Sequence, residues 1–307
     1  MNIMKIAIIG KNGQLGRSLQ KLVGFKKYNE NNDKPIYTFI GRDELDLSIS
    51  SNIELFFEKN RFDVIVNAAA YTNVDMAEVE KNLANQINNM AVKKLAEIAS
   101  KNETNLIHIS TDYVFDGKNK KPYSEIDPTN PLNVYGKTKL DGEQAICKIM
   151  KKNATIIRTS WVYSEYGNNF VKTMMRMGKD ANEIQVISDQ TGSPTYATDL
   201  ANIVIKFIES KYQNEKPSNT EIYHYSNNGE ISWYDFALSI FKLSEIDCIV
   251  QPIETRSFIS KAERPENSLM SKIKIEKELD IKIPFWKNSL EEAINIIMME
   301  SKKNEYI

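Results

Sequence analysis

A tyrosine and a lysine lie four residues apart in Tyr135-Gly-Lys-Thr-Lys139, a stretch typical of the first turn of a helix. Residues at i and i+4 share a helix face, so the Lys139 ammonium can lie beside the Tyr135 hydroxyl. A nearby positive charge favours the phenolate and lowers a tyrosine pKa that is ordinarily about 10. The pair therefore predicts a general acid near neutral pH, although Tyr-x-x-x-Lys alone is common by chance.

Hydroxyl side chains precede this pair in the sequence. A predicted buried strand over 106–109 runs into Ser110-Thr-Asp112. Side chains at the carboxyl end of a parallel strand point into the crevice where such sheets bind ligands. The Pro-rich segment 122–131 can connect this strand to the helix of Tyr135. A hydroxyl, a phenol and an ammonium could thus meet around one carbonyl group.

A cofactor site is indicated near the N-terminus. The apolar run 4–9 is followed by Gly10, Gly13 and Gly16 and by a helical pattern over 15–23. Glycines at this spacing allow a tight turn and a close approach of the backbone to a pyrophosphate at the helix N-terminus. The spacing is G-x-x-G-x-x-G rather than the G-x-G-x-x-G of the dinucleotide fingerprint, and a plain strand-to-helix turn is the alternative.

The end of the next predicted strand, 36–40, bears on the choice of cofactor. In a dinucleotide-binding fold this strand end meets the adenosine ribose, where an acid suits the 2′-hydroxyl and an arginine suits a 2′-phosphate. Arg42 favours NADPH, while Asp43 beside it keeps NADH possible. A third strand over 62–67 leads into Ala68-Ala-Ala-Tyr-Thr72, which a flat cofactor could approach closely.

The order of these segments predicts an α/β fold. Strand and helix patterns alternate as far as Trp161, which favours a Rossmann-type doubly wound parallel sheet. Beyond that point the pattern loosens, and we expect a smaller C-terminal α/β substrate-binding lobe. The predicted NAD(P)-binding Rossmann domain covers residues 1–160, with 196–212 packing back on it. The predicted substrate-binding lobe covers 161–195 and 213–307.

Composition argues against several other classes of protein. The 307 residues carry a net charge of -1, so no strong field favours nucleic acid or an anionic membrane. The two cysteines, Cys147 and Cys248, lack CxxC spacing, and two histidines are too few for a histidine-rich metal centre. No apolar run approaches a membrane span, and the N-terminus lacks signal-peptide features. We expect a cytoplasmic monomer or homodimer.

Motifs along nearly the whole chain resemble the extended short-chain dehydrogenase/reductase family. Besides the glycine turn they are Val66-Asn-Ala-Ala-Ala-Tyr-Thr-Asn-Val-Asp75, Ser110-Thr-Asp-Tyr-Val-Phe115, Asn133-Val-Tyr-Gly-Lys-Thr-Lys139, Arg158-Thr-Ser-Trp-Val-Tyr163, Gly167-Asn-Asn-Phe170, Asp189-Gln-x-Gly-x-Pro-Thr195 and Arg264-Pro-x-Asn-Ser268. The motifs at 158–163 and 264–268 are more similar to members that reduce a nucleotide-linked keto sugar than to the related epimerases and dehydratases.

The resemblance implies reduction of the C4 keto group of dTDP-4-dehydro-β-L-rhamnose with NADPH, with NADH as the alternative cofactor. It implies that Tyr135 donates the proton, Lys139 binds the nicotinamide ribose and Thr111 hydrogen-bonds the substrate carbonyl. The expected cofactor contacts are Gly10, Gly13, Gln14 and Leu15 at the pyrophosphate, Arg42, Asp46 and Leu47 at the adenosine end, and Ala70, Tyr71 and Thr72 further along. Asp112 and Trp161 would meet the nucleotide sugar.

The sequence also bears on the role of Arg264, on a Mg²⁺ site and on the alternatives to a reductase. Arg264, which precedes a proline in an irregular stretch, is a candidate clamp for a phosphate or the substrate, or else a surface-loop residue. In some family members Mg²⁺ bridges a dimer through glutamates, one just after the glycine turn; Ser18 stands there in this chain, so no Mg²⁺ site is predicted. The alternatives to a reductase are an epimerase or dehydratase of the same family and a non-catalytic nucleotide-binding regulatory subunit.

Overall fold

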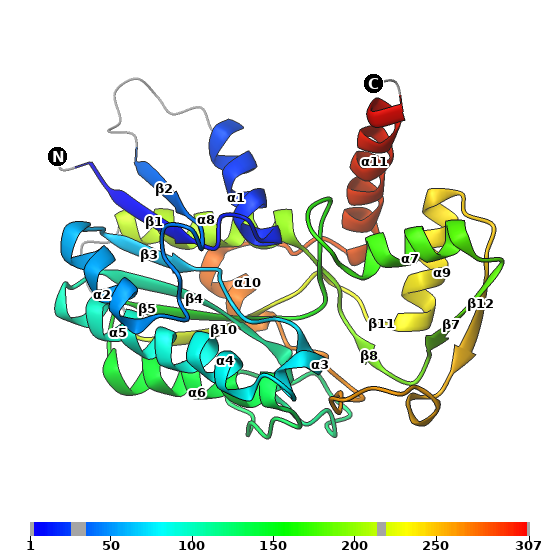
Figure 1. Ribbon diagram of the computed structural model, residues 1–307, viewed down its shortest axis with the longest axis horizontal. Coiled ribbons are helices and arrows are strands. Elements are labelled where there is room, and N and C mark those ends of the chain that lie inside the picture. The colour runs from blue at the N-terminus through cyan, green and yellow to red at the C-terminus, as the bar shows by residue number, and fades with distance from the viewer. Residues whose placement is uncertain (1–2, 26–34, 214–218, 306–307) are drawn as a thin grey trace.

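A six-stranded parallel sheet forms the larger part of the molecule (Figure 1). The computed structural model describes residues 3–25, 35–213 and 219–305. The strand order is β10-β5-β4-β3-β1-β2. These strands are β1 (Lys5–Ile9), β2 (Ile36–Ile40), β3 (Val64–Asn67), β4 (Asn105–Thr111), β5 (Ala154–Thr159) and β10 (Glu221–Tyr225). The predicted Rossmann-type doubly wound sheet is confirmed.

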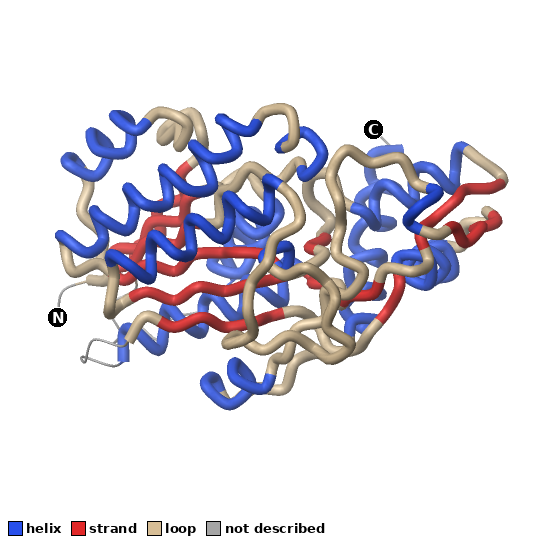
Figure 2. Tube along the Cα trace, turned by 90° about the horizontal axis from the view of Figure 1, so that it is seen from below, coloured by secondary structure: helices blue, strands red, loops and turns tan. Residues whose placement is uncertain are grey.

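Helices cover both faces of this sheet, as Figure 2 shows from below. Successive side chains of a strand point to opposite faces, so β1 contributes Ile6 and Ile8 to one core and Ala7 and Ile9 to the other. The first core includes residues of α1 (Gln14–Phe25) and α8 (Ala197–Gln213). The second includes residues of α2 (Ser50–Lys59), α5 (Ala91–Lys101) and α6 (Val134–Ile149).

Strand β10 belongs to this sheet and not to the smaller lobe. It pairs in parallel with β5, from Glu221 beside Thr155 to Tyr225 beside Thr159. Tyr223 and Tyr225 fill the same core as α1 and α8. Residues 221–225, and also Ile275 and Ile283, therefore belong to the larger half rather than to the predicted substrate-binding lobe of 213–307. A short apolar run predicts a strand, but it does not say which sheet the strand joins.

The smaller α/β lobe lies beside the carboxyl ends of the sheet strands (Figure 1). Its core joins residues of three helices with residues of a two-stranded pair, β7 and β12. Its elements are β6 (Val162–Tyr163), α7 (Phe170–Asp180), β7 (Glu183–Ile187), β8 (Thr191–Gly192), β9 (Thr195–Tyr196), β11 (Ile231–Ser232), α9 (Trp233–Ser244), β12 (Ile249–Ile253) and α11 (Trp286–Glu305). A 3-10 turn, Thr255–Ser257, follows β12, and helix α10 (Ile273–Leu279) then packs back on the core of the large sheet.

The connections place a ligand crevice between β1 and β3. The chain passes from β1 to β2 on one side and then crosses to β3 on the other, and ligands bind where strand order reverses in this way. After β3 come α3 (Val74–Ala77), α4 (Lys81–Asn85) and a π-helical turn, Gln86–Met90. Within the described ranges, none of the helices has the length and apolar character needed to cross a membrane.

Candidate active site

A cavity of about 650 Å³ opens at the carboxyl ends of the sheet strands and brings together residues from distant parts of the chain. A second cavity of about 390 Å³ adjoins it at the glycine turn. The larger one is lined by Gly10, Gly13, Gln14, Leu15, Ala70, Thr72, Thr111, Asp112, Tyr135, Lys139 and Trp161 among others. The smaller one is lined by Arg42, Asp46, Leu47 and Tyr71, and shares Gly10, Gly13, Ala70 and Thr72 with the first.

The glycine turn is shaped for close approach of a ligand to its backbone. Gly10 has φ +100°, and a Cβ there would lie 2.9 Å from the backbone nitrogen of Ala69. A Cβ on Gly16 would lie 2.1 Å from the Gly10 carbonyl oxygen, so helix α1 can pack this closely only with glycine there. Gly13 lines both cavities next to the first residue of α1. This cradle fits a dinucleotide pyrophosphate at the helix N-terminus.

The side chain of Gln14 fastens this turn to the smaller lobe. Its Oε1 accepts hydrogen bonds from Ser164 Oγ and Asn169 Nδ2, both at 2.9 Å, and its Nε2 donates to the Val162 carbonyl at 3.2 Å. The amide is thus committed to protein partners. Any contact of Gln14 with a pyrophosphate would use its backbone N–H.

The smaller cavity contains the residues expected at the adenosine end. Arg42 is largely exposed, and its Nε donates to Asp46 Oδ2 at 3.1 Å. The pKa of Asp46 is lowered by hydrogen bonds from Ser48 and, more weakly, by Arg42. Lys11 reaches the same edge, where its ammonium lies 2.6 Å from Glu44 and 3.5 Å from Asp43. Both basic side chains at this end of the cavity are thus paired with carboxylates.

Helix α6 begins at Val134, directly before Tyr135, for local reasons. Asn133 is its N-cap, and the Asn133 Oδ1 accepts a hydrogen bond from the Gly136 N–H at 2.8 Å. A Cβ on Gly136 would lie 2.1 Å from the Tyr113 carbonyl oxygen, so only glycine lets this turn pack against Tyr113. The rings of Tyr113 and Tyr135 meet edge to face with centroids 5.4 Å apart. This contact holds the phenol ring at the cavity wall.

The Lys139 ammonium is held by the end of β4. It donates to the Ile109 carbonyl at 2.6 Å and lies 3.3 Å from His108 Nε2. Burial lowers the pKa of Lys139 to about 8, against the effect of the Glu143 carboxylate. Burial also raises the pKa of Tyr135 to about 12, while a hydrogen bond with Thr111 acts in the opposite direction. The expectation that Lys139 lowers the pKa of Tyr135 is therefore wrong for this arrangement.

Thr111 and Asp112 form a buried polar pair at the cavity. Thr111 Oγ1 donates to Asp112 Oδ1 at 2.8 Å, while Asp112 Oδ2 has no hydrogen-bond partner among the described residues. The hydroxyl of the neighbouring Ser110 is also buried, and it too has no hydrogen-bond partner among the residues that the structure describes. Burial raises the pKa of Asp112 to about 7. Polar atoms left unpaired beside a cavity suit a ligand that brings hydrogen-bonding groups of its own.

Replacing Asp112 by asparagine is expected to raise the free energy of unfolding at pH 8 by about 2 kcal/mol, because no buried charge then has to form. In the folded wild type Asp112 stays protonated up to about pH 7, whereas the unfolded chain ionises it near pH 4. Wild-type stability should thus fall as pH rises through this interval. Urea denaturation at several pH values measures the effect. An Asp112→Asn curve with the wild-type slope over the same interval would contradict it.

Two tryptophans form another wall of the cavity. Trp161 has φ +49°, and its ring stacks on Trp233 with centroids 3.5 Å apart and an angle of 11° between the planes. Trp233 therefore covers one face of Trp161, and both residues line the cavity. Trp161, which is expected to meet the nucleotide sugar, is therefore one member of a stacked pair. Trp233 was not among the predicted site residues because it begins a helix of the smaller lobe, far from Trp161 in the sequence.

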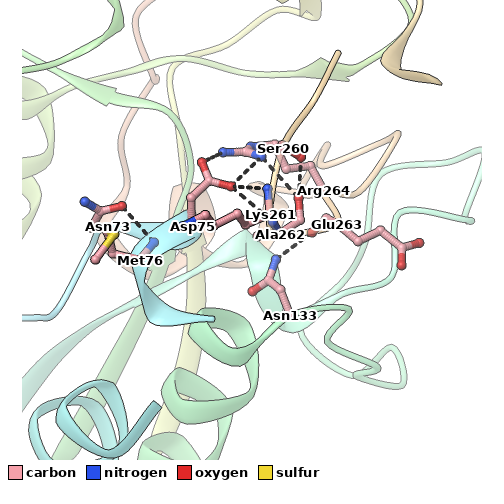
Figure 3. A network of polar contacts seen from close by, with 9 residues as sticks. All are labelled: Asn73, Asp75, Met76, Asn133, Ser260, Lys261, Ala262, Glu263 and Arg264. Atoms are coloured by element: carbon pink, nitrogen blue, oxygen red, sulfur yellow. Dashed lines mark hydrogen bonds and ion pairs between the residues drawn. The ribbon is translucent and has the colours of Figure 1, made fainter. Parts of the chain in front are cut away.

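Arg264 lies in an ion pair rather than in a cavity wall (Figure 3). Its Nη2 donates to Asp75 Oδ2 at 2.6 Å, and this interaction holds the pKa of Asp75 below its usual range. Arg264 is not among the residues that line either cavity described above. The sequence around Arg264, a proline-flanked arginine in an irregular stretch, does not indicate that it pairs with Asp75.

Sequence reasoning missed buried polar residues that support the site. Asn88, in the π-helical turn, bonds both the N–H and the carbonyl of Tyr71 and donates to Thr138 Oγ1 at 3.2 Å. His108 Nδ1 lies 3.1 Å from Asn67 Nδ2. A π-turn often marks a functional site, but nothing in the local sequence distinguishes it from an ordinary helix.

The doubly wound sheet, the glycine turn and the cluster of Thr111, Tyr135 and Lys139 define an extended short-chain dehydrogenase/reductase. The chain belongs to the RmlD substrate binding domain family, whose model matches residues 4–299. Within the described residues, no group of three or more His, Cys, Asp or Glu side chains could hold a metal ion.

One curated relative and two solved structures are similar to this chain over nearly its full length. The dTDP-4-dehydrorhamnose reductase of Aggregatibacter actinomycetemcomitans is 39% identical, covering 93% of this chain and 97% of its own. A solved dTDP-4-dehydrorhamnose reductase from Clostridium acetobutylicum has a TM-score of 0.88 and 39% identity, covering 96% of this chain and 100% of that one. The Bacillus anthracis enzyme in complex with NADP has a TM-score of 0.86 and 35% identity, covering 95% and 99%.

Proposed function

We propose that the protein reduces the C4 keto group of dTDP-4-dehydro-β-L-rhamnose with NADPH, giving dTDP-L-rhamnose. The observation that carries the proposal is a single cavity lined both by the glycine turn and by Thr111, Tyr135 and Trp161. The names of the relatives support the substrate, and the NADP in the Bacillus anthracis structure supports the cofactor.

NADPH supplies the hydride in this reaction. Gly10, Gly13 and the backbone at the start of α1 would hold its pyrophosphate, and the smaller cavity would take its adenosine end. Lys139, one helical turn from Tyr135, would bind the nicotinamide ribose. These residues fit the cofactor because the glycine turn leaves backbone open to the cavity.

The protein's own part is to place and neutralise charge. Negative charge grows on the substrate oxygen as hydride reaches C4, and Tyr135 would donate its proton to that oxygen. Tyr135 carries its proton throughout the neutral range, because burial raises its pKa to about 12. Thr111 would hydrogen-bond the same oxygen. Asp112 and the Trp161 side chain would contact the nucleotide sugar.

The test follows the absorbance of the reduced nicotinamide as purified protein is mixed with dTDP-4-dehydrorhamnose. We expect substrate-dependent oxidation of NADPH. Purified protein that carries tightly held NAD⁺ and consumes no reduced cofactor would indicate an epimerase or dehydratase instead. Nucleotide binding without turnover of any 4-keto sugar would indicate a regulatory subunit.

The division of labour along the chain is part of the proposal. The sheet with α1, α2, α5, α6 and α8 would bind the cofactor, and the smaller lobe would bind most of the nucleotide sugar. We propose that the protein acts in the cytoplasm, as a monomer or homodimer.

Arg42→Ala is expected to lower kcat/KM for NADPH by about tenfold while changing the value for NADH by less than about twofold, because a charged hydrogen bond to the 2′-phosphate contributes about 1.5 kcal/mol. Steady-state rates with each cofactor at fixed substrate measure this. The exposed Arg176→Ala, on α7 of the smaller lobe, is the matched control. Equal losses with both cofactors would contradict a role at the 2′-phosphate.

A further inference from the structure

Residues 260–264, which we call the 260–264 segment, run from the smaller lobe across to the cofactor-binding half of the molecule (Figure 3). Asp75, in the short helix α3, is its first anchor. Asp75 Oδ1 accepts from the backbone N–H groups of Lys261 and Ala262, each at 3.1 Å, and Oδ2 accepts from Arg264 Nη2 at 2.6 Å. One carboxylate thus holds three donors of the segment.

The second anchor is the N-cap of α6. Besides capping the helix, Asn133 donates its Nδ2 to the Glu263 carbonyl at 2.7 Å. The start of α6 also contacts Glu78, the C-cap of α3, because the Val134 N–H donates to Glu78 Oε1 at 2.8 Å. The 260–264 segment, the α3 region and the first turn of α6 are therefore joined pairwise. Tyr135 is the second residue of that turn.

The segment also reaches the ring on which Tyr135 rests. Burial raises the pKa of Tyr113, whereas the positive charge of the Arg264 guanidinium acts against this increase. The Tyr113 ring packs edge to face against Tyr135. Asp75 thus pairs with Arg264, the charge of Arg264 acts on Tyr113, and the Tyr113 ring contacts the phenol of Tyr135.

The geometry argues against a free anion clamp at Arg264. Its guanidinium is paired with a carboxylate and its side chain is only 21% exposed. The first turn of any helix lacks half of its backbone hydrogen bonds, so outside contacts decide how firmly it is held. Three such contacts meet at the first turn of α6: Asn133 with Glu263, Val134 with Glu78, and Tyr135 with Tyr113.

We propose that the 260–264 segment is a positioning element for Tyr135, and that Asp75, Asn133 and Arg264 are positioning residues for proton donation. The inference rests on the proposed reductase function. The expected effect is on kcat rather than on substrate binding. A small displacement of a reacting group, caused by a substitution far from the reacting atoms, can lower the rate about 10²-fold.

The test compares three single variants with wild type. Asp75→Asn keeps an oxygen for the two backbone N–H groups but loses the charge for Arg264. Arg264→Gln removes the other partner. Asn133→Ser keeps a helix cap but cannot donate to Glu263. Each is expected to lower kcat about 10- to 100-fold with both KM values within about twofold of wild type. Lys261→Gln, whose exposed side chain makes none of these contacts, should match wild type.

The double variant Asp75→Asn/Arg264→Gln separates positioning from clamping. Because Asp75 and Arg264 act as one pair, kcat of the double variant should fall no further than kcat of either single variant. The proposal would be overturned if Arg264→Gln raised the substrate KM while Asp75→Asn kept the wild-type kcat. Arg264 would then be a clamp for the substrate. Wild-type kcat in all three single variants would also overturn it.

Hydrogen exchange supplies a readout that needs no turnover. Amides of residues 133–139 are expected to exchange faster in Asp75→Asn and Asn133→Ser than in wild type, and unchanged exchange would overturn the proposal. A wild-type protein inactive on every 4-keto sugar would refute the proposed function, while the exchange result would still decide whether the segment holds the turn.

Discussion

Tyr135→Phe is expected to lower kcat by about 10²- to 10⁴-fold, the usual range for loss of a positioned general acid. Only the hydroxyl is removed, so the phenyl ring can keep its edge-to-face contact with Tyr113. Thermal unfolding and NADPH affinity should therefore stay close to wild type. Steady-state kinetics with dTDP-4-dehydrorhamnose, together with a fluorescence titration of NADPH, measures both quantities.

A matched control removes the same atom elsewhere. Tyr234→Phe changes a half-buried tyrosine of α9 that lines neither of the two cavities, and it should keep wild-type kcat. If Tyr135→Phe turned over at a rate near wild type, Tyr135 would not be the proton donor. Thr111 or a bound water would then have to supply the proton.

Arg158→Met is expected to lower the free energy of unfolding by about 3 to 5 kcal/mol, because it leaves the Glu143 carboxylate buried without its partner. The two side chains are only 3% and 2% exposed, and Arg158 Nη2 donates to Glu143 Oε2 at 2.6 Å. The pair joins α6 to β5 one turn beyond Lys139. Guanidinium chloride denaturation at neutral pH measures the change.

Two further variants show whether the buried charge is the cause. Arg158→Met combined with Glu143→Gln should cost less than Arg158→Met alone, since no unpaired charge remains in the core. Lys94→Gln breaks a more exposed pair with Glu54 and should cost no more than about 1 kcal/mol. Equal losses for Arg158→Met and Lys94→Gln would mean that burial of the charges does not set the cost.

The parallel sheet could be predicted because each of its central strands is a short apolar run between helical patterns. The run 4–9, for example, contains strand β1, which lies between β3 and β2. The cavity could be predicted as well, since the carboxyl ends of parallel strands meet at one edge, and that edge gathers Thr111 and Tyr135. These inferences need only periodicity and strand order.

The directions of long side chains could not be predicted. Helical spacing lets Lys139 lie beside Tyr135, but the lysine has enough rotatable bonds to reach the Ile109 carbonyl instead. Arg264 and Asp75 are 189 residues apart, and no local pattern connects them. The stacking of Trp161 on Trp233 depends in the same way on how the lobe folds back.

The late entry of β10 into the sheet has a consequence for how the protein is made. During translation the edge of β5 stays open until the ribosome has also produced α7, β7 and α8, because β10 follows them in the chain. A fragment ending at residue 160 would expose that edge and leave the Tyr223 side of the core unfilled, conditions that favour aggregation. The cofactor-binding half is therefore not a separable module, and truncations of the gene should keep residues through 283, because Ile275 and Ile283 also lie in this core.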